Sequence, residues 1–256
     1  MEFGGQLEVT YVMGGLAREF EDDLSSLVIT WLDHTAESRM PTDPRMWHSD
    51  GVRSTYPACI AFRAAAEQGP AAAERYLRIL REGFMCHGRK LDAPEALVAE
   101  ARRAKLDVRR FRIDLESNAI LEDFGSDLEE SRTIPDAARQ AGLATEGSHG
   151  SKVERLAFPT LRFIPGDGDG AERWVGGGNS YDEWRAAAIA AGATPSAEPP
   201  PGVEAALRRF HSMATAELEA VCDLPGPRAG AESWRLASEW RLRRVPVLGG
   251  ELWELA

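Results

Sequence analysis

The chain has 256 residues, a formal net charge of −11 and 43% hydrophobic residues. A chain of this length buries enough surface to fold without disulfides, and it contains no apolar run long enough to span a bilayer. The acidic balance argues against non-specific binding to nucleic acid or to anionic lipid. Its three cysteines, Cys59, Cys86 and Cys222, are too few and too widely spaced for a disulfide framework. We therefore expect a cytoplasmic protein with no membrane or nucleic-acid partner.

The first predicted element is a strand over Leu7–Met13, where apolar and polar residues alternate until Gly14 and Gly15 end the run. Ahead of this strand, Met1–Phe3 is followed by two further glycines and resembles the last turn of a helix. From about residue 16 to residue 145 the apolar spacing is almost wholly helical, with one helix expected to begin at Leu16. Another helix is expected to be capped by Asp92 and Glu95.

Strands return after these helices. Ala157–Ile164 and Glu172–Val175 read as the two strands of a hairpin. The turn between them, Asp167–Gly170, lacks the ligand pattern of an EF-hand loop, and we expect no metal site. Ser180 and Glu183 form a predicted capping box for a helix that follows the hairpin.

A proline-rich linker at residues 194–202 separates the last part of the chain. Residues 203–256 predict a small, mainly helical appendage that ends in a hairpin, in an order like that of a winged helix. We therefore expect two units, residues 1–195 and residues 203–256. The fold class is α/β.

Three short segments carry a family resemblance. Tyr11–Leu16, Ser54–Ala58 and Ala157–Leu161 resemble, in order and spacing, segments of the DsbA-like thioredoxin-fold family. The resemblance covers roughly Met1 to Gly192 and implies a thioredoxin-like core. A large helical insertion, about residues 16–145, would interrupt that core.

The resemblance implies membership of a family with several functions. Family members include thiol–disulfide oxidoreductases, 2-hydroxychromene-2-carboxylate isomerases, kappa-class glutathione transferases and protease adaptors. Their first strand and helix carry a CxxC motif or a serine version of it, but this sequence has no CxxC and no strand before Leu7. We expect the reading frame to continue upstream of Met1 and to supply that motif. The Leu7–Met13 strand would otherwise lack its central neighbour in the sheet.

A DsbA-like thiol–disulfide oxidoreductase is the leading reading, with a thiol- or disulfide-bearing protein as its partner. The second reading is a glutathione-dependent isomerase or transferase of the 2-hydroxychromene-2-carboxylate isomerase type. That branch would act on a small-molecule substrate with glutathione as co-substrate, and no other cofactor is expected. The third reading is a non-catalytic thioredoxin-fold adaptor.

The resemblance also places a substrate-binding loop. It implies a cis peptide bond between Phe158 and Pro159, with Phe158, Pro159 and Thr160 facing the substrate and binding it without performing chemistry. Gly176 and Gly177 precede the helix that follows the hairpin, and they could hold an anion there or serve as a connector.

Cys59 is the candidate catalytic thiol because it lies close to a family-like segment and a helix start, with arginines nearby in sequence. A packing role is the alternative for this lone cysteine. Cys86 and Cys222 lack metal-ligand spacing.

Overall fold

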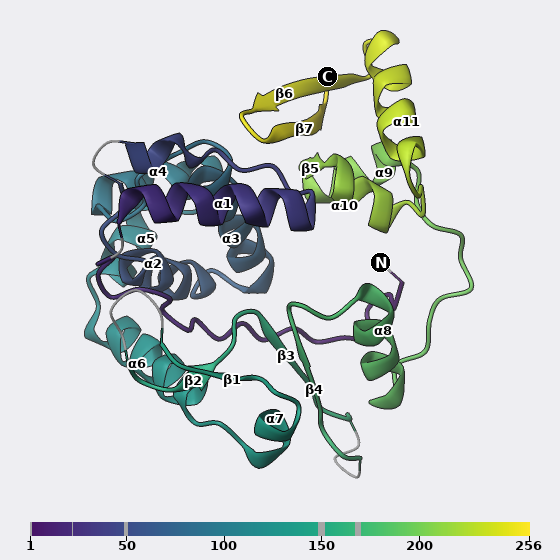
Figure 1. The fold of residues 1–256 in the computed structure, drawn as a ribbon. Helices are drawn as coiled ribbons and strands as arrows, with labels where there is room; N and C mark the ends of the chain where they lie inside the picture. Colours follow the sequence, from purple (N-terminus) through teal and green to yellow (C-terminus); the bar gives the residue numbers. More distant parts are fainter. Residues whose placement is uncertain (1, 22, 49–50, 148–151, 167–169) are drawn as a thin grey trace.

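Helices dominate the computed structural model, and the strands of its described residues form three small separate sheets (Figure 1). The structure describes residues 2–21, 23–48, 51–147, 152–166 and 170–256, so most of the acidic turn at 167–170 lies outside the described residues. The helices up to the hairpin are α1 (Leu24–Ser38), the 3-10 helix η1 (Pro44–His48), α2 (Tyr56–Ala66), α3 (Pro70–Met85), α4 (Pro94–Arg103), α5 (Val108–Leu115), α6 (Asn118–Arg132) and α7 (Asp136–Gln140).

The remaining elements follow in chain order. They are β1 (Ala144–Thr145), β2 (Arg155–Leu156), β3 (Thr160–Phe163), β4 (Arg173–Gly176), α8 (Tyr181–Ala190), α9 (Val203–Phe210), β5 (Ser212–Ala214), α10 (Thr215–Val221), α11 (Pro227–Ser238), β6 (Leu242–Val247) and β7 (Gly250–Leu255). All strand pairs are antiparallel: β1 with β2, β3 with β4, and β5–β7–β6 in a three-stranded sheet. In the described part of the chain, no helix is long and apolar enough to cross a membrane.

The segment Leu7–Met13 is not a strand, so that prediction is wrong. The segment is an extended stretch of chain that has no ladder partner in the described part of the chain, and the preceding residues 2–5 form a turn rather than a helix end. An alternating pattern specifies which side chains face a core, but a strand also needs a neighbouring backbone to pair with. Within the described residues the β3–β4 hairpin likewise has no third strand.

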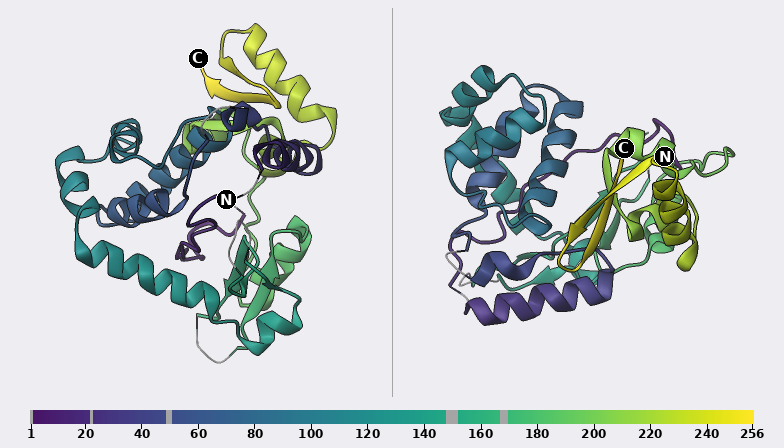
Figure 2. Two further views of the ribbon diagram at one scale, coloured as in Figure 1. Left: turned by 60° about the vertical axis from the view of Figure 1, so that its left-hand side comes forward. Right: turned by 90° about the horizontal axis from the view of Figure 1, so that it is seen from above.

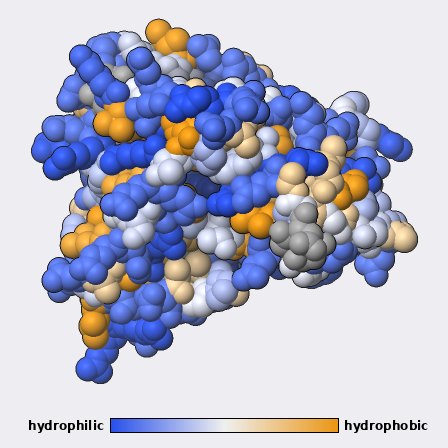
Figure 3. All heavy atoms as spheres, turned by 90° about the horizontal axis from the view of Figure 1, so that it is seen from below, coloured by the Kyte–Doolittle hydropathy of each residue, from blue (hydrophilic) through white to orange (hydrophobic). Residues whose placement is uncertain are grey.

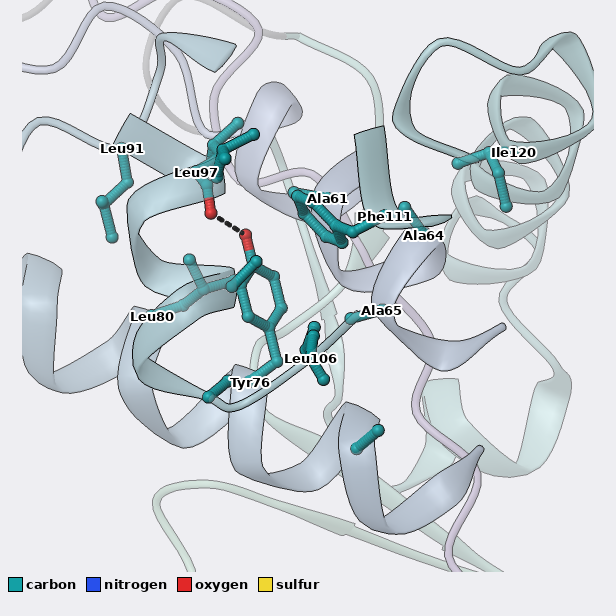
Figure 4. Packing of buried hydrophobic residues seen from close by; sticks show 14 residues of the cluster. Ala61, Ala64, Ala65, Tyr76, Leu80, Leu91, Leu97, Leu106, Phe111 and Ile120 are labelled. Atoms are coloured by element: carbon teal, nitrogen blue, oxygen red, sulfur yellow. Dashed lines mark hydrogen bonds between the residues drawn. The ribbon is translucent and has the colours of Figure 1, made fainter. Parts of the chain in front are cut away.

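The largest core lies among α2–α6 (Figure 4). Small alanines on α2, including Ala61 and Ala65, allow the helix to pack closely against α3 and α5. Tyr76 on α3 is completely buried, and its hydroxyl donates to the Leu97 carbonyl oxygen at 3.0 Å. This bond gives the Tyr76 hydroxyl, the one polar atom of that side chain, a hydrogen-bond partner inside an otherwise apolar cluster.

A second, aromatic cluster fixes α1 and η1. Trp31 and Trp47 meet edge to face with ring centroids 5.5 Å apart, and both contact Phe84 of α3. Helix α1 begins at Leu24, later than the apolar spacing predicts, because the Asp23 side chain caps it by accepting from the Ser26 N–H.

Two further predictions about helix ends have opposite outcomes. Ser180 and Glu183 form the expected capping box at α8. Asp92 does not cap α4; its carboxylate accepts from the Arg53 N–H at 2.8 Å, and α4 begins at Pro94 without a side-chain cap. A proline at the first helical turn needs no hydrogen bond to its nitrogen, which makes a cap less necessary.

The C-terminal residues form their own apolar cluster around the completely buried Trp253. Arg78 of α3 links this cluster to the helical region, since its guanidinium donates to the Ser212 carbonyl and to the Glu217 carboxylate. The two views in Figure 2 show the C-terminal elements beside α1 and α3 and away from α6. On the face seen from below, apolar residues form small separate areas among polar ones, and a hollow opens near the centre (Figure 3).

Candidate functional site

The three family-like segments, far apart in sequence, meet in the structure. Gly14 lies against the Phe158 ring so closely that a Cβ atom at Gly14 would stand 1.9 Å from the Phe158 Cζ atom. At Gly15, whose φ is +59°, a Cβ atom would lie 2.8 Å from Tyr56. The two glycines therefore allow the extended segment to pass between the loop at residue 158 and the start of α2.

Backbone hydrogen bonds hold this junction. The Thr55 N–H donates to the Ala17 carbonyl at 2.9 Å, and the Ala17 N–H donates to the Thr55 hydroxyl at 2.9 Å. The Phe20 N–H donates to the Arg53 carbonyl at 2.9 Å. These bonds explain why residues 16–21 are not helical: the backbone groups of Ala17 and Phe20 are used against residues 53–55.

The Phe158–Pro159 peptide bond is cis, as the resemblance implies. Phe158 is 38% exposed, and the Arg155 guanidinium lies 4.2 Å from the centre of its ring. The Pro159 carbonyl accepts from the Gly177 N–H at 2.7 Å, and a Cβ atom at Gly177 would stand 2.5 Å from the proline ring. The loop thus presents an aromatic side chain on a tightly held backbone.

Gly176 and Gly177 do not have the geometry of an anion cradle. The Gly176 N–H donates to the Asn179 side-chain oxygen at 3.0 Å, and its carbonyl accepts from the Trp184 indole at 3.0 Å. The Gly177 N–H is used by Pro159. Because both N–H groups bond within the chain, the glycines serve as a close-packed connector between β4 and α8.

One edge of β3 is open. In the β3–β4 register Thr160 lies opposite Gly176 and Arg162 opposite Trp174. Because Gly177 bonds to Pro159 while Gly176 bonds to side chains, the alternation of an antiparallel ladder points the N–H and C=O of Thr160 and Arg162 away from β4. Within the described residues no partner takes those groups.

A second open edge belongs to the extended segment. Residues 7–12 make no backbone hydrogen bond with any described residue. Leu7, Val9 and Val12 are 41%, 62% and 36% exposed, whereas Tyr11 packs edge to face on Phe62 of α2. Unpaired backbone with exposed apolar side chains is the usual template for adding another strand.

A buried ion pair that the sequence analysis missed anchors this segment. Asp127 on α6 is 3% exposed and binds the Arg63 guanidinium of α2 through both carboxylate oxygens. One of these oxygens also accepts from the Met13 N–H at 3.1 Å. The pair therefore joins two helices to the end of the extended segment.

Cys59 lies in the first turns of α2, near the backbone of Gly15. Burial raises the pKa of the Cys59 thiol from its ordinary value to about 11, and the nearby Asp127 carboxylate adds to the shift. A reactive cysteine needs a lowered pKa, so this environment disfavours the thiolate at neutral pH.

The other two thiols are also isolated. Cys86 donates to the Pro41 carbonyl at 3.3 Å, and burial raises the pKa of its thiol to about 12. Burial likewise raises the pKa of Cys222, which lies in the C-terminal apolar cluster. All three cysteines are free, and no two of them form a pair. Within the described ranges, no group of three His, Cys, Asp or Glu side chains could hold a metal ion. The site can bind through backbone edges and an aromatic ring, but it lacks a dithiol.

A family model described as Thioredoxin matches residues 1–134, a little over half of the chain. The chain belongs to this thioredoxin family. Its mixed helices and small sheets are therefore those of a thioredoxin-fold domain, whereas the match does not single out the DsbA-like branch.

Curated relatives extend the similarity over nearly the whole chain. The ClpXP adapter protein SpxH of Halalkalibacterium halodurans is 24% identical over 99% of this chain and 80% of its own length. Proteins of the same name from Shouchella clausii and Bacillus subtilis are 27% and 24% identical, over 88% and 89% of this chain and 68% and 71% of their own lengths. Each relative carries the name of an adaptor and not of an oxidoreductase.

Proposed function

We propose that this chain is a non-catalytic thioredoxin-fold adaptor that binds a protein, here called the client, and presents it to a ClpXP-type protease. The observation that carries the proposal is that its three cysteines are free and lie on separate elements, with Cys59 in α2, Cys86 at the end of α3 and Cys222 at the end of α10. A dithiol cycle needs an attacking thiolate close to a second sulfur. Similarity to adapter proteins over almost the whole chain supports the same reading.

The client would bind at the two open backbone edges. An extended client segment can add to β3 along Thr160 and Arg162 and to the extended segment at residues 7–12, with Phe158 contacting its side chains. Pro159, Gly176 and Gly177 would hold this edge in place through their mutual packing and hydrogen bonds. Hydrogen bonds to the client's main chain supply affinity and require little of the client's sequence. Such bonds suit a binding site for unfolded or extended protein.

The experiment measures protein half-lives in the source organism. Deleting the gene should lengthen the half-life of one or more ClpXP substrates, and expressing the wild-type chain should restore it. A matched pair of variants tests the edge: Arg162→Pro removes the open N–H, whereas Arg162→Ala removes only the side chain that pairs with Glu172. We expect Arg162→Ala to restore turnover and folded Arg162→Pro to fail. Unchanged half-lives of all ClpXP substrates in the deletion strain would contradict the adaptor function.

A further inference from the structure

Helix α1 is apolar around a much wider arc than the protein covers. Leu27 and Trp31 pack into the aromatic cluster and are 4% and 7% exposed. On the adjoining side Leu24, Ile29 and Leu32 are 41%, 59% and 47% exposed. At about 100° per residue these three side chains span roughly 140° of the helix surface. We call them the outer face of α1.

The helix has an exposed position that leaves this face open. Seen from above in Figure 2, α1 lies at the periphery of the molecule, with its length along the edge. Leu248, at the tip of the β6–β7 hairpin, is 56% exposed. Its neighbour Gly249 stands against Thr35 near the C-terminal end of α1, so another exposed leucine lies close to that end. Clusters of exposed large apolar side chains of this kind mark interaction surfaces.

The charge of α1 indicates which kind of partner would bind there. α1 contains Asp33 and Glu37 but no lysine or arginine. Both carboxylates are exposed on the flank beside Ile29, and in the described part of the chain their one ion-pair contact is the 3.9 Å approach of His34 to Glu37. Arg39, directly after the helix, is already bound to Glu219. An apolar stripe with an acidic flank is complementary to an amphipathic helix that carries Leu on one face and Lys or Arg beside it.

From this geometry we propose that the outer face of α1 binds a basic amphipathic helix of a partner protein. A second copy of the chain fits less well, because pairing two such faces brings acidic flanks together. The inference rests on the proposed adaptor function, since an adaptor needs a second surface besides the site that holds its client. The strand edges and the outer face of α1 would then serve different partners.

The test uses two synthetic peptides, each about 18 residues or five helical turns long. One has leucines on one face and lysines elsewhere, and the other has glutamates in place of the lysines. Fluorescence anisotropy measures the binding of each labelled peptide to the full chain. The disrupting variant is Leu24→Gln, Ile29→Gln and Leu32→Gln. Its matched control carries Ile113→Gln and Leu121→Gln, at exposed apolar positions on α5 and α6.

We expect the lysine peptide to bind, the disrupting variant to weaken binding at least about tenfold and the control variant to bind like the wild type. Exchanging Asp33 and Glu37 for lysine should reverse the preference in favour of the glutamate peptide. Circular dichroism verifies that each variant is folded. Equal binding by the disrupting variant, or equal binding of both peptides, overturns the proposal.

Two further outcomes separate this proposal from the adaptor function. A wild-type dimer that the disrupting variant converts to monomer would assign the face to a second copy and overturn the proposal. If the disrupting variant fails to bind the lysine peptide and also fails to restore client turnover in the deletion strain, both proposals gain support. If client turnover needs the chain but peptide binding does not need the outer face, only the present inference is wrong.

Discussion

The buried pair between Asp127 and Arg63 offers the sharpest test of how the candidate site is held. Replacing Asp127 with alanine leaves the Arg63 guanidinium without its carboxylate partner and the Met13 N–H without an acceptor. Removing one partner of a buried pair costs about 3–5 kcal/mol. Arg63 is 23% exposed and recovers some hydration, so we expect a loss near the lower end, about 3 kcal/mol. For a chain of this size that corresponds to a decrease in Tm of about 6–12 °C.

The assay combines thermal unfolding with amide hydrogen exchange. Exchange at Met13 should accelerate more than exchange in the helical core, because the mutation releases the extended segment first. Asp123→Ala, at an exposed position of the same helix, is the control and should change stability by less than about 0.5 kcal/mol. Asp127→Asn keeps an acceptor for Met13 and should fall between the two. If Asp127→Ala unfolds at the same temperature as Asp123→Ala, the pair does not anchor the segment.

Three other outcomes follow from the same geometry. Gly14→Ala should displace the Phe158 ring and cost about 1–3 kcal/mol in a urea titration, and wild-type stability would show that the contact is not close. Arg78→Ala should detach the C-terminal cluster from α3, so that elastase, which cleaves after small residues such as the alanines of this linker, cuts the linker before α9 faster, whereas an unchanged cleavage rate would refute this role. The folded pKa of Cys59, about 11, exceeds its ordinary value of 9.0, so the folded state keeps its proton longer. Stability should therefore fall as the pH rises from 9 to 11, by up to about 1.4 kcal/mol per pH unit, and folded Cys59→Ala should lack this part of the pH dependence.

Local signals in the sequence predicted much of the helical and hairpin structure. Pro70 begins α3, the Ser180 capping box begins α8, and the two runs around residue 168 form the β3–β4 hairpin. These features depend on neighbouring residues, so a sequence pattern is enough to specify them. The cis bond before Pro159 was predicted in another way, from the resemblance to a family loop.

Features that depend on distant contacts were harder to predict. Alternation in Leu7–Met13 predicts a strand, yet among the described residues no strand pairs with the segment to form a ladder. Helical spacing continues from Leu16 into α1, although Ala17 and Phe20 form hydrogen bonds with the chain at 53–55. Asp127 is one of several acidic residues on α6, and nothing in the sequence distinguishes the one that is buried against Arg63.

The central claim is that the chain acts by binding and not by thiol chemistry. The most direct measurement compares wild-type protein with the variant Cys59→Ala, Cys86→Ala, Cys222→Ala in a reconstituted degradation reaction. This reaction contains ClpX, ClpP and a client identified from the half-life measurements. We expect both proteins, verified as folded, to accelerate client degradation to the same extent and neither to reduce insulin. Insulin reduction by the wild type, together with loss of client degradation in the cysteine-free variant, would contradict the claim.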